Sequence, residues 1–277
     1  MASRVRLDTE LVRRGLARSR SHAAELVAAG AVRVRGVAAG KPATMVDRAD
    51  PIVVDAGRPG TDYVSRGGHK LAGALAALAP GPVVAGRRCL DAGAAAGGFT
   101  DVLLRAGAAE VVAVDVGYGQ LAWSIRNDPR VRVLERTNVR TLTPATIGGP
   151  VGLTVADLSF ISLRLVLPAL AACTEPDGDL LLMVKPQFEV GRERVGAGGV
   201  VRDPALRAEA VRAVAETAAG LALGVAGVTA SPLPGPAGNV EIFLWLRQGA
   251  PPLDQQRLDA VVYNSSDVPA PTEGPHR

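Results

Sequence analysis

Residues 87–115 read RRCLDAGAAAGGFTDVLLRAGAAEVVAVD, and this stretch decides the fold of most of the chain. The apolar residues up to Leu90 predict a short strand, and the glycine-rich residues 93–98 predict a tight turn. Residues 100–105 predict the start of a helix, and residues 111–114 predict a second strand that ends at Asp115. Strand, glycine turn, helix, strand and terminal acid are together typical of a nucleotide-binding βαβ unit.

The glycine turn lacks the residue that a dinucleotide site needs. In the pattern G-x-G-x-x-G the middle glycine lets the backbone approach a pyrophosphate. Gly93 and Gly98 fit the outer positions, but Ala95 occupies the middle one. S-adenosylmethionine carries no phosphate, so it does not require that approach. Asp115 is placed to accept hydrogen bonds from both ribose hydroxyls of its adenosine, and residues 97–99 are placed to lie against its methionine end. The turn therefore predicts S-adenosylmethionine as the cofactor.

The rest of the chain continues the alternation of strands and helices. Strands are predicted over residues 131–134, 153–156 and 180–184, a helix over residues 204–219, and two strands near residues 224–230 and 241–246. This pattern predicts an α/β fold with a Rossmann-like S-adenosylmethionine-dependent methyltransferase domain. Ligands of such sheets gather at the carboxyl ends of the strands, and Asn138 after the third strand is placed to contact the adenine ring. The predicted cofactor-binding residues are Asp91, Gly93, Gly97, Gly98, Phe99, Asp115, Asn138 and Asp157.

The first 60 residues form a small basic module. They hold 11 Lys and Arg against 6 Asp and Glu, a net charge of +5, whereas residues 61–277 hold 20 against 21, a net charge of −1. Apolar residues at helical spacing predict a first helix that ends near Gly15, and Ser19 is placed to cap a second helix. Residues 32–36 alternate valine with arginine and predict a strand. A basic module joined to a near-neutral body indicates a polyanionic partner.

This module resembles the S4 RNA-binding domain. The matching residues are Arg6-Leu7-Asp8, Leu11, Gly15, Ser19-Arg20, Ala23-Ala24, Leu26-Val27, Gly30, Val32-Arg33-Val34, Gly36 and Lys41-Pro42. The resemblance implies a small α+β fold that binds structured RNA, mostly by phosphate contact and shape, through Arg6, Arg18, Arg20 and Lys41. One departure is Arg35, which stands where many S4 domains have Asn before the glycine of a turn, and it leaves the turn geometry open.

Lysine is rare in this chain and stands near the predicted site. Only Lys41, Lys70 and Lys185 are lysines among 31 basic residues. Unlike arginine, lysine can exchange a proton during catalysis. Lys185 directly follows a predicted strand 28 positions after Asp157, so both side chains are expected to face the same cleft.

The order Lys70, Asp157, Lys185, Glu241 is similar to the Lys-Asp-Lys-Glu tetrad of ribosomal RNA ribose 2′-O-methyltransferases with an FtsJ-like domain. Together with the S4-like module, the chain resembles the TlyA family over residues 4–247. Further matching segments are Ser65-Arg66-Gly67, residues 115–121, residues 184–189, and residues 231–241. The resemblance implies S-adenosylmethionine-dependent 2′-O-methylation of cytidine ribose in 16S and 23S ribosomal RNA. It makes the tetrad catalytic and Arg66 an RNA contact. Ala95-Ala96 replaces the Ser-Thr of some relatives, so a hydroxyl contact to the cofactor is lost.

The chemistry of ribose methylation fits the tetrad. The sulfonium methyl is already activated, so the enzyme has to place the ribose hydroxyl in line and remove its proton. Lys185 is the candidate base if its amine is neutral. In an equally permissible mechanism the amine stays protonated and orients the hydroxyl.

Enzymes that methylate other atoms of RNA have other sequence signatures. Methylation of base amino groups usually follows Asn/Asp-Pro-Pro-aromatic, whereas residues 157–160 read DLSF, and carbon-5 methylation needs a cysteine nucleophile, which neither Cys89 nor Cys173 is placed to supply.

The expected organisation is an S4-like domain over residues 1–60, a linker over 61–64, an FtsJ-like methyltransferase domain over 65–248 and a flexible tail over 249–277. Two cysteines form neither a metal cluster nor a disulfide framework, so no metal is expected. No apolar run is long enough to span a membrane, and no membrane partner is expected. The expected protein is cytoplasmic and acts on ribosomal RNA or ribosomal subunits.

Two other functions are possible for such a chain. One is a ribosome assembly factor with a non-catalytic methyltransferase fold, and the other is a membrane-active haemolysin, a name that the family also carries. The modified nucleotides and the oligomeric state do not follow from the sequence.

Overall fold

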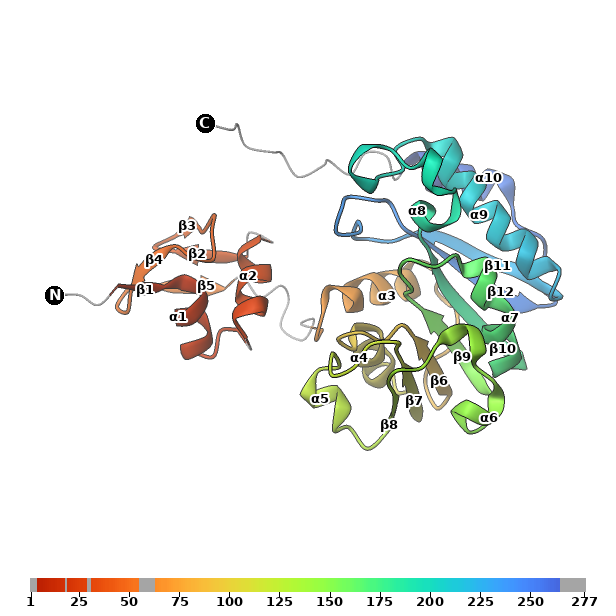
Figure 1. Ribbon diagram of the computed structural model, residues 1–277, viewed down its shortest axis with the longest axis horizontal. Helices are drawn as coiled ribbons and strands as arrows, with labels where there is room; N and C mark the ends of the chain where they lie inside the picture. Colours follow the sequence, from red (N-terminus) through yellow and green to blue (C-terminus); the bar gives the residue numbers. More distant parts are fainter. Residues whose placement is uncertain (1–3, 18, 29–30, 55–62, 265–277) are drawn as a thin grey trace. The chain divides into compact units, whose positions relative to one another are not determined.

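The computed structural model describes residues 4–17, 19–28, 31–54 and 63–264, and it divides the chain into two compact units, Met1–Asp62 and Tyr63–Arg277 (Figure 1). Residues 61 and 62 of the expected linker and the predicted RNA contact Arg18 lie outside the described residues. Tyr63 and Val64, also expected in the linker, belong to the second unit.

The first unit is a small α+β module. Leu7 and Leu11 of its first helix are fully buried, the chain leaves that helix through Gly15 at a φ of +70°, and the Ser19 hydroxyl accepts a hydrogen bond from the His22 amide at 3.1 Å. Strand β1 pairs with β4, and β2 lies between β3 and β5, all antiparallel. The elements are β1 (Arg4–Arg6), α1 (Leu7–Arg13), α2 (Arg20–Ala28), β2 (Val32–Val34), β3 (Val37–Ala38), β4 (Met45–Asp47) and β5 (Ile52–Val54).

The turn between β2 and β3 shows how the chain accommodates Arg35. Val34 pairs with Val37, so only Arg35 and Gly36 form the turn, at φ values of 52° and 81°. Two left-handed residues make the type of hairpin turn that favours Asn-Gly, so an arginine is strained here. An ion pair of 2.7 Å between Arg35 Nη2 and Asp50 Oδ1 holds the side chain in this place.

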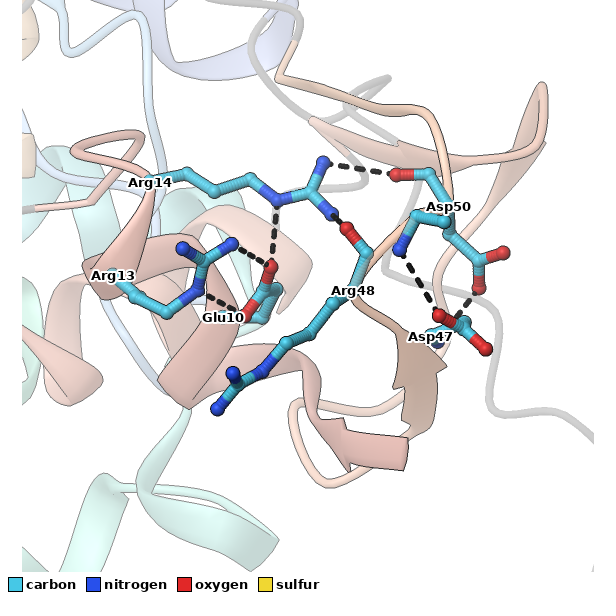
Figure 2. Close-up of polar contacts among 7 residues, drawn as sticks. Glu10, Arg13, Arg14, Asp47, Arg48 and Asp50 are labelled. Atoms are coloured by element: carbon cyan, nitrogen blue, oxygen red, sulfur yellow. Dashed lines mark hydrogen bonds and ion pairs between the residues drawn. The ribbon is translucent and has the colours of Figure 1, made fainter. Parts of the chain in front are cut away.

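Arg14, directly after α1, fastens this helix to the loop between β4 and β5 (Figure 2). The Arg14 guanidinium donates to Glu10 Oε1 at 2.8 Å, to the Asp50 carbonyl at 2.9 Å and to the Arg48 carbonyl at 2.7 Å. Arg13 also binds Glu10, at 2.6 Å. The Arg13 hydrogen bond, with that of Arg14, lowers the pKa of Glu10 to about 2 although burial opposes this shift. One arginine thus joins two segments that lie far apart in the sequence.

The second unit is built on a seven-stranded sheet of order β11-β12-β10-β9-β6-β7-β8, which confirms the predicted α/β fold class. The five strands from β8 to β10 in this order are parallel, whereas β12 is antiparallel to both of its neighbours. The strands are β6 (Arg88–Ala92), β7 (Glu110–Val114), β8 (Val131–Leu134), β9 (Val151–Ala156), β10 (Thr174–Val184), β11 (Leu223–Ala230) and β12 (Ile242–Gln248). The α-helices are α3 (Arg66–Ala77), α4 (Gly98–Arg105), α5 (Trp123–Arg126), α6 (Pro144–Ile147), α7 (Leu163–Cys173), α8 (Pro186–Glu189), α9 (Pro204–Ala219) and α10 (Gln255–Asn264). Short 3-10 helices are Val139–Thr141, Arg192–Arg194 and Ala197–Gly199.

Helices cover both faces of this sheet (Figure 1). Successive strand residues point to opposite faces, so Cys89 packs with the residues of α3 and α4, whereas Leu90 packs with those of α7 and α9. The expectation of a flexible tail from residue 249 is wrong for residues 255–264. They form α10, whose Leu258 and Val262 are fully buried in the same core as Leu90.

Candidate active site

The glycine turn lies at the centre of the sheet, where the strand order reverses. Strands β6 and β9 are neighbours there, with β7 and β8 on one side and β10 on the other, and such a position is where open α/β sheets bind ligands. Gly93 and Gly97 have φ values of +90° and +92°, which favour glycine. A Cβ at Gly93 would lie 2.5 Å from the Asp157 carbonyl oxygen. The turn after β6 therefore touches the segment after β9 with no side chain between them.

Asp115 at the end of β7 closes this turn from the other side. Its Oδ2 accepts from the Ala95 amide at 2.8 Å and its Oδ1 from the Gly117 amide at 2.6 Å. Ala95 has a φ of 45°, so the middle position of the motif keeps the left-handed backbone that glycine would adopt easily. The pocket beside Asp115 is lined by Ala94, Ala95, Ala113, Asp115, Gly117, Gln120, Leu121, Val133 and Glu135.

Asn138, predicted to contact adenine, is not among the residues that line this pocket. Its side chain is exposed, and its Oδ1 accepts from the Arg140 amide at 3.0 Å to cap a 3-10 helix. Glu135 lies at the pocket instead, where it accepts from the Gly119 amide at 2.8 Å and pairs with Arg126. Because Glu135 directly follows β8, the strand-end rule applied to Asp115 could have found it.

Asp91 lies beneath the turn and is fully buried. Its Oδ2 accepts from the Thr100 hydroxyl at 2.6 Å, while its Oδ1 has no hydrogen-bond partner among the described residues. Burial raises the pKa of Asp91 to about 7, and the negative charges of Asp157 and Asp115 add to this effect. Three carboxylates thus lie close together, and the partnerless oxygen is suited to a cationic or hydrogen-bonding ligand.

The first turn of α3 packs against the start of α4. A Cβ at Gly98 would overlap the Ser65 hydroxyl and lie 2.8 Å from the Gly68 amide nitrogen. The Phe99 side chain is buried and stacks on Phe243 at 6.0 Å between ring centroids, so only its backbone is available to the turn. The glycines predicted to hold the cofactor also allow this close packing.

Tyr63 anchors the beginning of the second unit at the same place. Its ring lies against Gly68, where any Cβ would overlap it, and 4.9 Å beneath the Arg105 guanidinium. The next residue, Val64, donates its amide to Asp101 Oδ2 at 2.9 Å. The chain that enters this unit is therefore fastened to both α3 and α4.

The structure brings the four predicted catalytic residues together as two ion pairs. Lys70 Nζ lies 2.5 Å from Glu241 Oε2, and Lys185 Nζ lies 2.6 Å from Asp157 Oδ1. Lys70 projects from α3, whereas Asp157 and Lys185 follow β9 and β10. Glu241 precedes β12, which runs antiparallel to β10 with Ile242 opposite Val184, so its position is next to that of Lys185.

The two ion pairs differ in their access to solvent. The side chains of Lys70 and Glu241 are 8% and 1% exposed, so this pair is enclosed. The Lys185 side chain is 9% exposed, but that of its partner Asp157 is 24% exposed, and the amine also donates to the exposed Ser159 hydroxyl at 3.0 Å. A substrate can therefore reach the second pair more easily. Ser159 had no predicted role, because its contact with Lys185 forms between the ends of two different strands and no local sequence pattern indicates it.

An open depression of about 470 Å³ is lined in part by residues that follow Ser159 and Lys185 closely in the chain, and it is large enough for a nucleotide base. Phe160 at its edge is 91% exposed at a strained φ of 63°, and its ring centroid is 5.2 Å from that of Phe188. The lining residues are Phe160, Ile161, Ser162, Gln187, Phe188, Gly191, Arg192, Val195 and Gly199.

Glu189 joins the two segments that border this depression. Its buried carboxylate accepts from the Ser162 hydroxyl at 2.5 Å and from the Leu163 amide at 2.7 Å. Burial raises the pKa of Glu189. The contacts tie α8, which follows Lys185, to the start of α7, which follows Ser159 and Phe160.

Of the predicted RNA contacts of the first unit, Arg6, Arg20 and Lys41 are exposed, and the first two are held in place by a carboxylate. Arg6 and Arg20 both bind the buried Asp8 carboxylate, at 2.8 Å and 3.1 Å. The Arg6 hydrogen bond, aided by that of Arg20, keeps the pKa of Asp8 well below its usual range. Lys41 is exposed in the same unit, and Arg66 is exposed at the start of α3 in the other.

The described ranges contain neither a metal-ligand cluster nor a membrane-spanning helix. No group of three or more His, Cys, Asp or Glu side chains there is arranged to hold a metal ion. Within the same ranges, no helix has both the length and the apolar character needed to cross a bilayer.

Residues 63–248 match the family described as FtsJ-like methyltransferase, and residues 5–52 match the S4 domain. The fold and the site thus define a methyltransferase that carries an S4 domain.

Individual relatives narrow this class. The chain is 65% identical over 249 residues to the 16S/23S rRNA (cytidine-2'-O)-methyltransferase TlyA of Mycobacterium tuberculosis. These residues cover 89% of this chain and 91% of that protein. It is 35% identical to Hemolysin A of Brachyspira hyodysenteriae, over 86% of this chain and 97% of that one. A solved structure from Streptococcus thermophilus, named as a hemolysin, has a TM-score of 0.74 at 36% identity and covers 96% of both chains. The chain belongs to the TlyA family of FtsJ-like methyltransferases.

Proposed function

We propose that this protein transfers a methyl group from S-adenosylmethionine to the ribose 2′-hydroxyl of cytidine in 16S and 23S ribosomal RNA. The observation that carries this proposal is the ion pair of Lys185 with Asp157 directly beside the glycine turn, where Gly93 meets the Asp157 carbonyl. A relative with 65% identity is named for this reaction. As an enzyme of ribosomal RNA, the protein would act in the cytoplasm.

The residues around the turn fit S-adenosylmethionine. This cofactor carries a sulfonium and an ammonium group, and the three carboxylates of Asp91, Asp115 and Asp157 supply the complementary charge. The partnerless oxygen of Asp91 is one acceptor for a donor group of the cofactor. Asp115 and Glu135 would hold the adenosine in the pocket that they line. Backbone amides at the start of α4 would face the methionine carboxylate.

Lys185 is the residue that aligns the ribose hydroxyl and handles its proton. When bound, S-adenosylmethionine supplies an already activated methyl group, so the protein has to align the ribose hydroxyl and manage its proton. Lys185 either accepts that proton as a neutral amine or orients the hydroxyl as a cation. Asp157 holds the amine in place, and the enclosed pair of Lys70 and Glu241 joins α3 to the start of the adjoining strand β12. A rate that rises with pH favours the neutral amine.

The depression beside Lys185 would receive the base of the target nucleotide. Aromatic rings can stack on unstacked bases, and the exposed Phe160 and the half-buried Phe188 both line this depression. The S4 domain would hold the surrounding RNA through phosphate contacts of Arg6, Arg20 and Lys41. Arg18 is expected to join them, and Arg66 adds a contact from the methyltransferase unit.

The test is methyl transfer from labelled S-adenosylmethionine to purified 30S and 50S subunits, with the modified positions mapped by mass spectrometry. Wild-type protein should methylate cytidine riboses. Lys185→Ala and Asp157→Ala should lower the single-turnover rate by at least about 100-fold. Lys41→Ala, which leaves the tetrad intact, should instead weaken subunit binding.

Other results would contradict the proposal. Cofactor binding without methylation of any subunit would favour an assembly factor. Leakage of dye from liposomes at protein concentrations too low for methylation would favour a haemolysin. An undiminished rate in Lys185→Ala would remove that lysine from its role.

A further inference from the structure

Ser159 contributes the second acceptor for the Lys185 amine. Lys185 Nζ donates to Ser159 Oγ at 3.0 Å and pairs with Asp157 Oδ1 at 2.6 Å. Both acceptors belong to the segment that follows β9, two positions apart. The start of this segment is fixed, because the Asp157 amide donates to the Ala92 carbonyl at 3.1 Å.

The geometry of an amine gives this second contact a consequence. The nitrogen of lysine is tetrahedral, with one bond to carbon and three other directions. If Asp157 alone held the amine, the group could turn about its last carbon–nitrogen bond. When the amine contacts both Asp157 and Ser159, these two acceptors occupy two of its three free directions. The third direction then points in one fixed orientation. A neutral amine keeps its lone pair in that third direction, and a cation keeps its third N–H there.

We propose that Ser159 is a positioning residue that aims the third direction of the Lys185 amine at the ribose hydroxyl. This inference rests on the proposed function, and it holds for either protonation state of Lys185. The enclosed Lys70 amine has a different environment, in which Glu241 at 2.5 Å is its one polar contact among the described residues. The strained backbone of Phe160 turns the chain immediately after Ser159, so the hydroxyl reaches the lysine while the next side chain is exposed.

Single-turnover methylation of ribosomal subunits tests the role of Ser159 in the reaction. Ser159→Ala should lower the rate of the chemical step on the order of tenfold, because a misaimed amine loses orientation. The KM values for cofactor and subunit should stay unchanged. Ser159→Thr, which keeps the hydroxyl at an exposed position, should restore most of the rate. A wild-type rate in Ser159→Ala, or Ser159→Thr as slow as Ser159→Ala, would overturn the inference.

A second measurement does not depend on activity. The chain has only three lysines, so protein labelled with 15N-lysine gives at most three side-chain amine signals, and loss of one in Lys185→Arg assigns Lys185. Ser159→Ala should move the Lys185 signal and increase its mobility, while Lys41 and Lys70 serve as internal controls. An unchanged Lys185 signal would overturn the contact. A wild-type protein that transfers no methyl group would refute the proposed function separately, because the NMR comparison still decides whether Ser159 holds the amine.

Discussion

At the scale of single residues, the burial of Asp91 affects both the stability of the fold and the binding of a cationic ligand. Burial raises the pKa of Asp91 to about 7 in the folded chain, whereas an unfolded aspartate titrates near about 4. The folded state therefore binds the proton more tightly. Its contribution to stability is fully present below about pH 4 and is lost as pH rises through about 7. A cation bound beside the carboxylate would favour the ionised form and lower this pKa.

Cofactor affinity should therefore depend on pH through Asp91. The dissociation constant of S-adenosylmethionine, measured by calorimetry, should fall as pH rises from about 5 to about 7 and then level off, because ionised Asp91 attracts the cationic ligand. Asp91→Asn should bind more weakly and with a flatter pH dependence. The exposed Asp177→Asn is the matched control and should keep the wild-type slope. Equal slopes in wild type and Asp91→Asn would contradict this assignment.

Residues at strand ends were largely predictable, whereas partners across strands were not. Asp115, Asp157 and Lys185 follow strands that hydrophobic patterns identify, and Asp91 is the last residue but one of β6, so their shared edge follows from one rule. The same rule does not reach Asn138, because the place of a residue four positions past a strand depends on the path of a loop. Ser159 and its lysine are 26 positions apart, and no local pattern indicates such a contact.

At the scale of elements, the Arg14 clamp holds the S4 domain together. Its guanidinium bonds to Glu10 and to the carbonyls of Arg48 and Asp50, and a planar fork with several donors is needed to reach all three. Arg13 binds only the Glu10 carboxylate among the contacts described, and its side chain is 52% exposed. Arg13 and Arg14 share one carboxylate, but only Arg14 also connects it to the loop between β4 and β5, so we expect Arg14 to contribute more to stability.

Arg14→Met should loosen the first unit more than Arg13→Met does. Loss of the clamp should cost about 1–3 kcal/mol of local stability, because hydrogen bonds of a charged group are broken and two carbonyls lose a donor. Hydrogen–deuterium exchange of peptides over residues 45–54 measures this change, with residues 163–173 of the second unit as the internal reference. Equal exchange in the two variants would show that the clamp does not hold the loop.

Element boundaries agreed well with the sequence where periodicity was strong. The helix expected over residues 204–219 is α9 with the same bounds, and the strand over 131–134 is β8. The sequence interpretation missed α10 because residues 249–264 are rich in proline and charge. Only Leu258 and Val262 of this helix are buried, and two apolar positions are too few to distinguish a docked helix from a tail.

At the scale of the whole molecule, α10 extends the second unit beyond the matched methyltransferase residues 63–248. It packs against α9 and β11, and Arg212 of α9 donates to Gln255 at its start, at 3.0 Å. The fully buried Leu258 places this helix in the core that also covers one face of the sheet. The helix is thus part of the folded domain.

Leu258→Ala should lower the free energy of unfolding by about 2–5 kcal/mol, because it leaves a cavity between α10 and the core. The exposed neighbour Arg257→Ala should change it by less than about 0.5 kcal/mol. Thermal unfolding followed by calorimetry gives both values, read from the transition of the second unit. If Leu258→Ala unfolds like wild type, α10 does not contribute to the core.

The direction of β12 places a constraint on how this family can change. Glu241 directly precedes β12, and the register of that strand against β10, with Ile242 opposite Val184, helps to set the distance of Glu241 from the other reactive groups. Slippage of the ladder by two residues would carry the carboxylate about 7 Å away, and slippage by one would turn it to the opposite face. A single residue added within residues 242–248 would therefore turn the strand residues on one side of it to the opposite face and separate the Glu241 carboxylate from the Lys70 amine.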